Sequence, residues 1–158
     1  MRSNHNKGFK AVLVASFLSI TLGAGAAHAD VYDDTHQGWT YSNEWGAVSG
    51  GVYSGAYNGT LHLTQTPGSV ATFTCLNSSS FDLYITTAAN RGRFMVYVNG
   101  NSIGWVDAYS PTTQRQVLAL GGGYWVGFTG NFSVTIVSMD TKSSASTGYF
   151  VDIDAIEC

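Results

Sequence analysis

From residue 70 onward, apolar and polar residues alternate along the chain with a period of two. In VATFTC (70–75), Ala71, Phe73 and Cys75 fall on one face, and FDLYIT (81–86) alternates in the same way. Residues two apart share a face of a β-strand. The pattern therefore predicts strands, and the turn residues that separate them at short intervals predict a sandwich or a barrel.

The segment RFMVYVNGNSIGWVDAY (93–109) predicts a β-hairpin. Asn99 and Gly100 favour the positive φ angles of a two-residue type I′ turn. FSVTIVSM (132–139) and YFVDIDAIEC (149–158) predict two further strands. No segment keeps a 3.6-residue apolar period, so we expect little or no helix. By alternation, the expected core phenylalanines are Phe73, Phe94, Phe132 and Phe150.

The last of these strands is not cleanly apolar on either face. Asp152, Asp154 and Ile156 would share one face. Either the strand bulges near Asp154–Ala155, which would turn the carboxylates to solvent or to backbone donors, or the carboxylates enter the core and are neutralised there. The pattern alone leaves both alternatives open.

The first 29 residues have the organisation of a secretory signal peptide. Three basic residues precede the apolar run AVLVASFLSITLGAGA, and AHA at 27–29 is a small-x-small cleavage site. We therefore expect a secreted, extracellular protein whose mature chain is one domain, residues 30–158. The apolar run is short and no second one follows, so we expect no membrane span.

Charge and cysteine content narrow the partners and the compartment. From Asp30 onward, four basic residues stand against ten acidic ones, a formal charge of 4 − 10 = −6. This charge disfavours nucleic acid and anionic lipid as partners. The chain has two cysteines, Cys75 and Cys158. In an exported protein such a pair is expected to form a disulfide, and two free buried thiols are the alternative.

Several motifs together point to a known architecture. DDTHQGWTYSNEW (33–45), YNGTLH (57–62), ANRG (89–92), DAYSPTTQRQ (107–116) and YFVDIDAIE (149–157) resemble the galactose-binding-like jelly-roll modules of secreted and cell-surface proteins, which are related in architecture to carbohydrate-binding modules. The resemblance covers essentially the whole mature chain and implies an all-β jelly-roll β-sandwich. It leaves the ligand open, because this scaffold carries sugar-binding, protein-binding and structural roles.

The candidate binding residues lie in the loops. A sugar ring presents an apolar C–H face edged with hydroxyls, so it is bound by aromatic rings together with planar donors. We expect a carbohydrate-binding rim made by the Asn90–Arg91 loop, the Tyr109 loop with Gln114, and the Trp45–Tyr57 segment. Arg91→Ala and Tyr109→Ala are then expected to weaken binding without lowering the melting temperature. The aromatics expected to be exposed are Trp45, Tyr57, Tyr109 and Trp125.

The same resemblance implies a structural calcium ion. IDAIE (153–157) matches an Ile-Asp-x-Ile-Glu ending whose aspartate helps to hold calcium with acids of the N-terminal strand. Asp154 would then be a ligand together with Asp33 or Asp34, since calcium prefers several oxygen ligands. A β-bulge without calcium is the competing interpretation.

Signals of catalysis are weak. The sequence has no nucleophile elbow and no metal-spaced histidine cluster, and no spacing places two carboxylates across a cleft. We therefore expect a non-catalytic carbohydrate-binding module that acts at a glycan or cell surface. The alternatives are a protein-interaction or matrix component that self-associates without sugar and, less favoured, a small glycoside hydrolase.

Overall fold

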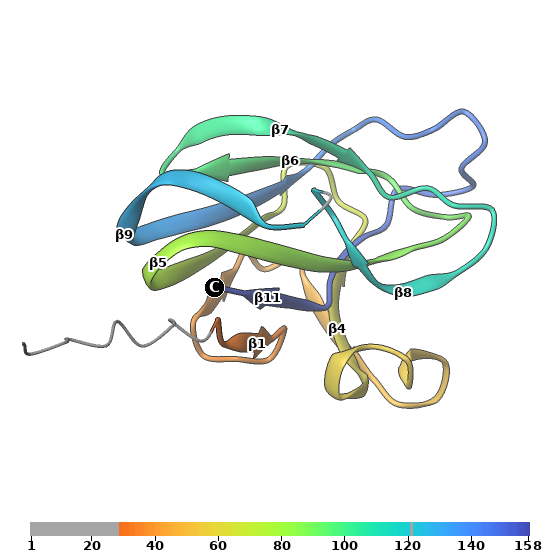
Figure 1. Ribbon diagram of the computed structural model, residues 1–158. Helices are drawn as coiled ribbons and strands as arrows, with labels where there is room; N and C mark the ends of the chain where they lie inside the picture. Colours follow the sequence, from red (N-terminus) through yellow and green to blue (C-terminus); the bar gives the residue numbers. More distant parts are fainter. Residues whose placement is uncertain (1–28, 121) are drawn as a thin grey trace, which may run out of the picture.

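The computed structural model describes residues 29–120 and 122–158 (Figure 1). The expected signal peptide therefore lies outside the described residues, apart from Ala29. The described chain is an all-β sandwich of two antiparallel sheets. Its strands are β1 (Val31–Asp33), β2 (Trp39–Tyr41), β3 (Gly46–Ser49), β4 (Thr60–Thr64), β5 (Val70–Thr87), β6 (Arg93–Val98), β7 (Asn101–Asp107), β8 (Gln114–Leu118), β9 (Tyr124–Ser138), β10 (Val151–Ile153) and β11 (Ala155–Glu157).

Strand β5 organises the larger sheet. The strand order in this sheet is β1-β11-β5-β9-β6-β7, and β2 and β8 also pair with β5. The first half of β5 lies between β2 and β9, whereas its second half pairs with β11 and β8. The smaller sheet has the order β10-β4-β3. The chain thus passes from the small sheet to the large one between β10 and β11.

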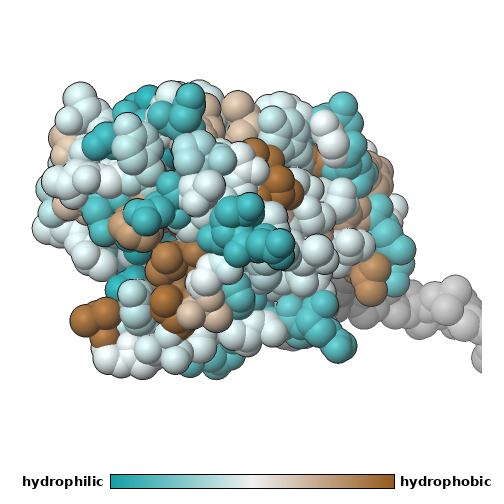
Figure 2. All heavy atoms as spheres, turned by 180° about the vertical axis from the view of Figure 1, so that it is seen from behind, coloured by the Kyte–Doolittle hydropathy of each residue, from teal (hydrophilic) through white to brown (hydrophobic). Residues whose placement is uncertain are grey.

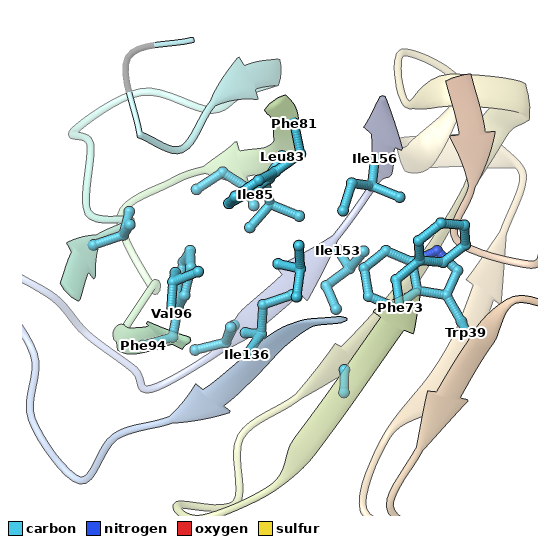
Figure 3. Close-up of a cluster of buried hydrophobic side chains, with 14 of the residues drawn as sticks. Trp39, Phe73, Phe81, Leu83, Ile85, Phe94, Val96, Ile136, Ile153 and Ile156 are labelled. Carbon is cyan, nitrogen blue, oxygen red and sulfur yellow. The ribbon is translucent and has the colours of Figure 1, made fainter. Parts of the chain in front are cut away.

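Apolar side chains gather inside the sandwich. Seen from behind, the surface is mostly hydrophilic, and its apolar side chains form small separate groups (Figure 2). In the core, Ile153 lies between the side chains of the second half of β5 and the pair Phe73 and Trp39 (Figure 3). Each large side chain that is buried in this way contributes about 1.5–3 kcal/mol to stability.

The predicted hairpin is confirmed. Strand β6 buries Phe94, Val96 and Val98 and exposes the alternate residues more. The φ angles of Asn99 (49°) and Gly100 (78°) are both positive, as a type I′ turn requires.

Three expectations for the fold need correction. VATFTC and FDLYIT are two halves of one 18-residue strand, β5, rather than separate strands. The strand expected at 132–139 begins earlier, because residues 124–131 form the first part of β9. Phe73, Phe94 and Phe132 are buried as predicted, but Phe150 is only half-buried. The described helical structure is limited to two 3₁₀ turns, Gly51–Tyr53 and Tyr57–Gly59, and within the described residues no helix has the length and apolarity to cross a membrane.

A disulfide joins Cys75 of β5 to Cys158, which confirms the predicted pair. The two Cα atoms are 5.6 Å apart, and the bridge spans 83 residues of sequence. Asp30 and Cys158 also exchange two backbone hydrogen bonds of 3.1 Å. The C-terminal strand is therefore held covalently on β5 and by hydrogen bonds on the segment that leads into β1.

Candidate functional site

A cleft of about 220 Å³ is lined by loop and strand residues that are far apart in the sequence. The Gly51–Gly59 segment, β8 and the loop between β9 and β10 all lie at one end of the sandwich, on the right in Figure 1. The cleft is lined by Tyr53, Leu63, Ala88, Asn90, Arg91, Thr113, Arg115 and Phe150. We refer to it as the arginine cleft.

Close backbone contacts place Asn90 and Arg91 beside Phe150. The amide of Gly92 donates to the carbonyl of Phe150 (2.9 Å), and the amide of Phe150 donates to the carbonyl of Asn90 (3.1 Å). A Cβ atom on Gly92 would lie 2.8 Å from the Tyr149 carbonyl oxygen, and one on Gly148 equally close to that of Asn90. Only glycine permits this approach, which explains the glycine in the ANRG motif.

Arg91 is buried at the back of the cleft rather than exposed on a rim. Its Nη2 lies 2.6 Å from Oδ2 of Asp152, and its Nη1 donates to Oδ1 of Asn90 at 2.8 Å. Asp152 also accepts the amide hydrogen of Thr86 at 2.6 Å. Burial raises the pKa of Asp152, and Arg91 provides the largest opposing effect.

This ion pair overturns one expectation. Removing one partner of a buried pair leaves an uncompensated charge, which costs about 3–5 kcal/mol. Arg91→Ala is therefore expected to lower the melting temperature, and it cannot serve as a variant that tests binding alone.

Arg115 lies in the same cleft in a different setting. It belongs to β8 and is half-buried. Its Nη1 donates to Oγ1 of Thr86 and its Nη2 to the carbonyl of Val52, both at 2.8 Å. Its guanidinium lies over the ring of Tyr53, 5.4 Å from the centroid. The Gly-rich segment thus folds against Arg115, and a Cβ on Gly55 would come within 3.2 Å of its Cγ.

The three segments predicted to form the rim do meet at this cleft, but partly through other residues. Asn90 and Arg91 line it as expected. The Trp45–Tyr57 segment contributes Tyr53, and the Tyr109 loop contributes Thr113 and Arg115. These three residues were not selected as binding residues from the sequence. Tyr53 could have been selected, because it lies among glycine and serine residues in the same way as Trp45 and Tyr57, which were selected.

The other predicted residues lie outside the lining. Trp45 is buried and packs on Tyr41, with ring centroids 5.6 Å apart, so its predicted exposure was wrong. Tyr109 and Tyr57 are half-buried. Gln114 is exposed, and its Oε1 accepts a long hydrogen bond (3.4 Å) from Oγ1 of Thr87. Trp125 is 69% exposed, as predicted, but does not line the cleft.

The polarity of the final strand is resolved at Asp154. Strand pairing is interrupted there as the chain leaves the small sheet and joins the large one. Asp152 and Asp154 are both buried rather than turned to solvent, but each accepts a backbone amide hydrogen, as the bulge alternative also allowed. Oδ1 of Asp154 accepts the amide hydrogen of Tyr57 at 2.6 Å, and its Oδ2 is buried without a hydrogen-bond partner among the described residues. Burial raises the pKa of Asp154 to about 6.

The remaining acids of the predicted calcium site have protein partners. Asp34 is buried, and its carboxylate lies 2.6 Å from Oγ1 of Thr60 and 2.7 Å from Nδ1 of His62. Asp33 accepts from Thr35 at 2.6 Å. Within the described part of the chain, no three His, Cys, Asp or Glu side chains are grouped so as to hold a metal ion. Calcium binding therefore stays a prediction from the sequence.

Comparison with known proteins identifies the fold. No protein-family model and no curated protein matches this sequence. Solved structures do match, among them a two-domain esterase active on acetylated mannans, with a TM-score of 0.61 and 8% identity over 82% of this chain and 36% of the esterase. A Paenibacillus xanthan lyase matches with a TM-score of 0.55 and 15% identity over 74% of this chain and 12% of the lyase. The CBM36-1 domain of a multidomain xylanase from the hindgut metagenome of Trinervitermes trinervoides matches with a TM-score of 0.51 and 13% identity over 82% of this chain and 94% of that domain. The chain has the fold of this CBM36 domain.

These matches confirm the architecture that the motifs implied. The chain spans about a third of the esterase and about an eighth of the lyase, but nearly all of the CBM36-1 domain. At such low identities the likeness establishes the fold, whereas the ligand has to be argued from this chain's own residues.

Proposed function

We propose that the protein is a non-catalytic carbohydrate-binding module that binds a sugar in the arginine cleft. The observation that carries this proposal is the composition of the cleft wall. The half-buried rings of Tyr53 and Phe150 line the same cavity as the side chains of Asn90 and Arg115. Aromatic surface and planar donors together suit a sugar ring, which is apolar on its faces and polar at its edge.

The size of the cleft sets the scale of binding. Its volume of about 220 Å³ is below the roughly 300–1,000 Å³ of pockets that enclose drug-sized ligands, so it suits one sugar unit. Open, water-competed contacts give weak affinity, and we expect a Kd between about 10 μM and 1 mM. Firm attachment to a glycan surface would require several modules to bind together.

The acid content of the cleft favours binding without turnover. Most glycoside hydrolases use two carboxyl groups that flank the scissile bond, about 5–10 Å apart. The residues that line the arginine cleft include neither aspartate nor glutamate. The Cys75–Cys158 disulfide supports a place outside the cytosol, where such bridges form and persist.

A glycan array followed by calorimetry tests this proposal. We expect Tyr53→Ala to weaken binding of the best array ligand at least about tenfold, which corresponds to ~1.4 kcal/mol. Trp125→Ala is the matched control, because it removes a more exposed ring that lies outside the cleft. It should bind like the parent.

Three other results of these experiments would contradict the proposal. Loss of binding in Trp125→Ala alone would move the site away from the cleft. Assembly that depends on protein concentration, without binding to any glycan, would favour the alternative of a self-associating matrix component. Hydrolysis of an array ligand would establish an enzyme instead.

A further inference from the structure

The basic residues of the chain are concentrated in the arginine cleft. After residue 29 the sequence has four basic residues, Arg91, Arg93, Arg115 and Lys142, against ten acidic ones. Two of these four line the cleft, and none of the ten acids does. A negatively charged domain thus presents a positive cavity at one end.

The positive charge in the cleft is not fully compensated. Arg91 has one carboxylate partner, Asp152, at 2.6 Å. Arg115 donates only to the neutral oxygens of Thr86 and Val52, and it forms no ion pair with any described residue. Counting Arg91, Arg115 and an ionised Asp152 gives a net charge of 2 − 1 = +1 for these three side chains. An anionic group on the ligand would balance this charge.

The donors of the cleft are held in place before a ligand arrives. Asp152 and Asn90 fix the guanidinium of Arg91, and its Nε is buried without an acceptor among the described residues. Thr86 and Val52 fix Arg115 in the same way. Fixed guanidinium groups suit planar or tetrahedral anions, because their N–H donors match the geometry of carboxylate and phosphate-like oxygens. Little ordering is then required when the ligand binds.

We propose that the ligand of the arginine cleft is an acidic saccharide, in which one sugar unit contacts Tyr53 and Phe150 and its anionic group binds at Arg115. This inference rests on the proposed function and narrows its ligand. The anionic group is a carboxylate, as in a uronic acid, or a sulfate ester. Both present oxygens that a guanidinium group can bind.

Calorimetry with matched ligands tests the inference. The probes are uronic acid disaccharides, their methyl esters, neutral disaccharides of the same linkage, and a sulfated disaccharide. We expect at least one acidic probe to bind about tenfold or more tightly than its ester or neutral counterpart. If the carboxylate probe shows this preference, the group is a uronate. If only the sulfated probe does, the group is a sulfate.

Variants assign the preference to Arg115. Arg115→Gln should abolish the preference for the acidic probe and bind acidic and neutral probes alike. Arg93→Gln is the matched control, because it removes the same charge from an arginine that pairs with Asp107 outside the cleft. It should keep the preference. Arg115→Lys keeps the charge but loses the paired N–H donors of the guanidinium group, so it should retain part of the preference for the acidic probe. This variant replaces Arg115→Gln if the glutamine variant does not fold.

The possible failures can be told apart. Neutral probes that bind as tightly as acidic ones would overturn this inference and leave the proposed function standing. An acidic preference that survives in both Arg115 variants would show that the anion binds elsewhere. Absence of binding to every probe and every glycan on the array would overturn both proposals.

Discussion

The two acids on either side of Ile153 are both buried, but the protein surrounds them differently. Asp152 faces a full positive charge, since Arg91 lies 2.6 Å away. Asp154, two residues later, accepts the backbone amide of Tyr57 and forms no ion pair with any residue that the structure describes. Burial raises the pKa of both carboxyl groups, but an arginine opposes the change only at Asp152. Two acids that lie close together in the chain can therefore have different roles: the pair of Asp152 with Arg91 stabilises the fold, whereas Asp154 makes the stability of the fold sensitive to pH.

The largest expected effect comes from breaking the ion pair between Arg91 and Asp152. Arg91→Ala should lower the free energy of unfolding by about 3–5 kcal/mol, because Asp152 is left buried and unpaired. Urea denaturation measures the change. Arg93→Ala is the control, since its pair with Asp107 is about 30% exposed and such pairs contribute at most ~1 kcal/mol.

A second substitution sharpens this result. Asp152→Asn in the Arg91→Ala background should recover part of the loss, because it removes the stranded charge and keeps an acceptor for the Thr86 amide. No recovery would mean that Arg91 stabilises the fold by packing rather than by charge.

The burial of Asp154 should make the stability of the protein depend on pH. The pKa of Asp154 is about 6 in the folded protein and 3.8 as the reference value, so between these values the folded state binds more protons than the unfolded state. The contribution of protonated Asp154 to the free energy of unfolding is fully present below pH ~3.8. It is lost as the pH rises to 6, and the loss is at most about 3 kcal/mol. Asp154→Asn should flatten this part of the profile, measured by urea denaturation in chelator. Identical slopes for parent and variant would contradict the assignment.

A smaller effect is expected from calcium. If Asp154 takes part in a calcium site, as the IDAIE motif implies, added calcium at pH 7 should raise the melting temperature, and Asp154→Asn should abolish the rise. Saturation at 100 times the Kd corresponds to about 2.7 kcal/mol. Magnesium at the same concentration controls for ionic strength. A melting curve that is indifferent to both calcium and chelator would leave Asp154 with protein partners alone.

The sequence predicted those parts of the fold whose causes are local. Strand β6 and its turn follow from a clean alternation and from Asn99-Gly100, and both are confirmed. Strands β1, β2, β10 and β11 have only three residues each. The segment 149–158 was predicted as one strand, but it divides into β10, which pairs with β4, and β11, which pairs with β5 and β1. Strand β5 could join its two alternating halves because register shifts accommodate the polar residues between them.

The candidate site was predictable by segment but not by residue. The composition of the loops pointed to the three segments that meet at the cleft, since binding residues tend to lie in loops on a rigid sandwich. The burial of Arg91 depends on Asp152, which is far away in sequence, and Trp45 is buried in a core to which distant strands contribute. Such contacts arise only from tertiary structure. The sequence could therefore name aromatic and arginine residues as candidates for binding, but it could not tell which of them line the cleft and which are buried in the core.

The position of β11 has a consequence for how the chain is synthesised. This strand lies between β1 and β5, so residues 155–157 complete the larger sheet by pairing with 31–33 on one side and with 82–84 on the other. A ribosome-bound chain that still lacks these residues would leave β1 without its neighbour and Cys75 without its partner. We therefore expect the larger sheet and the disulfide to be completed only after residues 155–158 have been synthesised, and a chain stalled a few residues earlier should stay open to proteases even though nearly all of its core has been made.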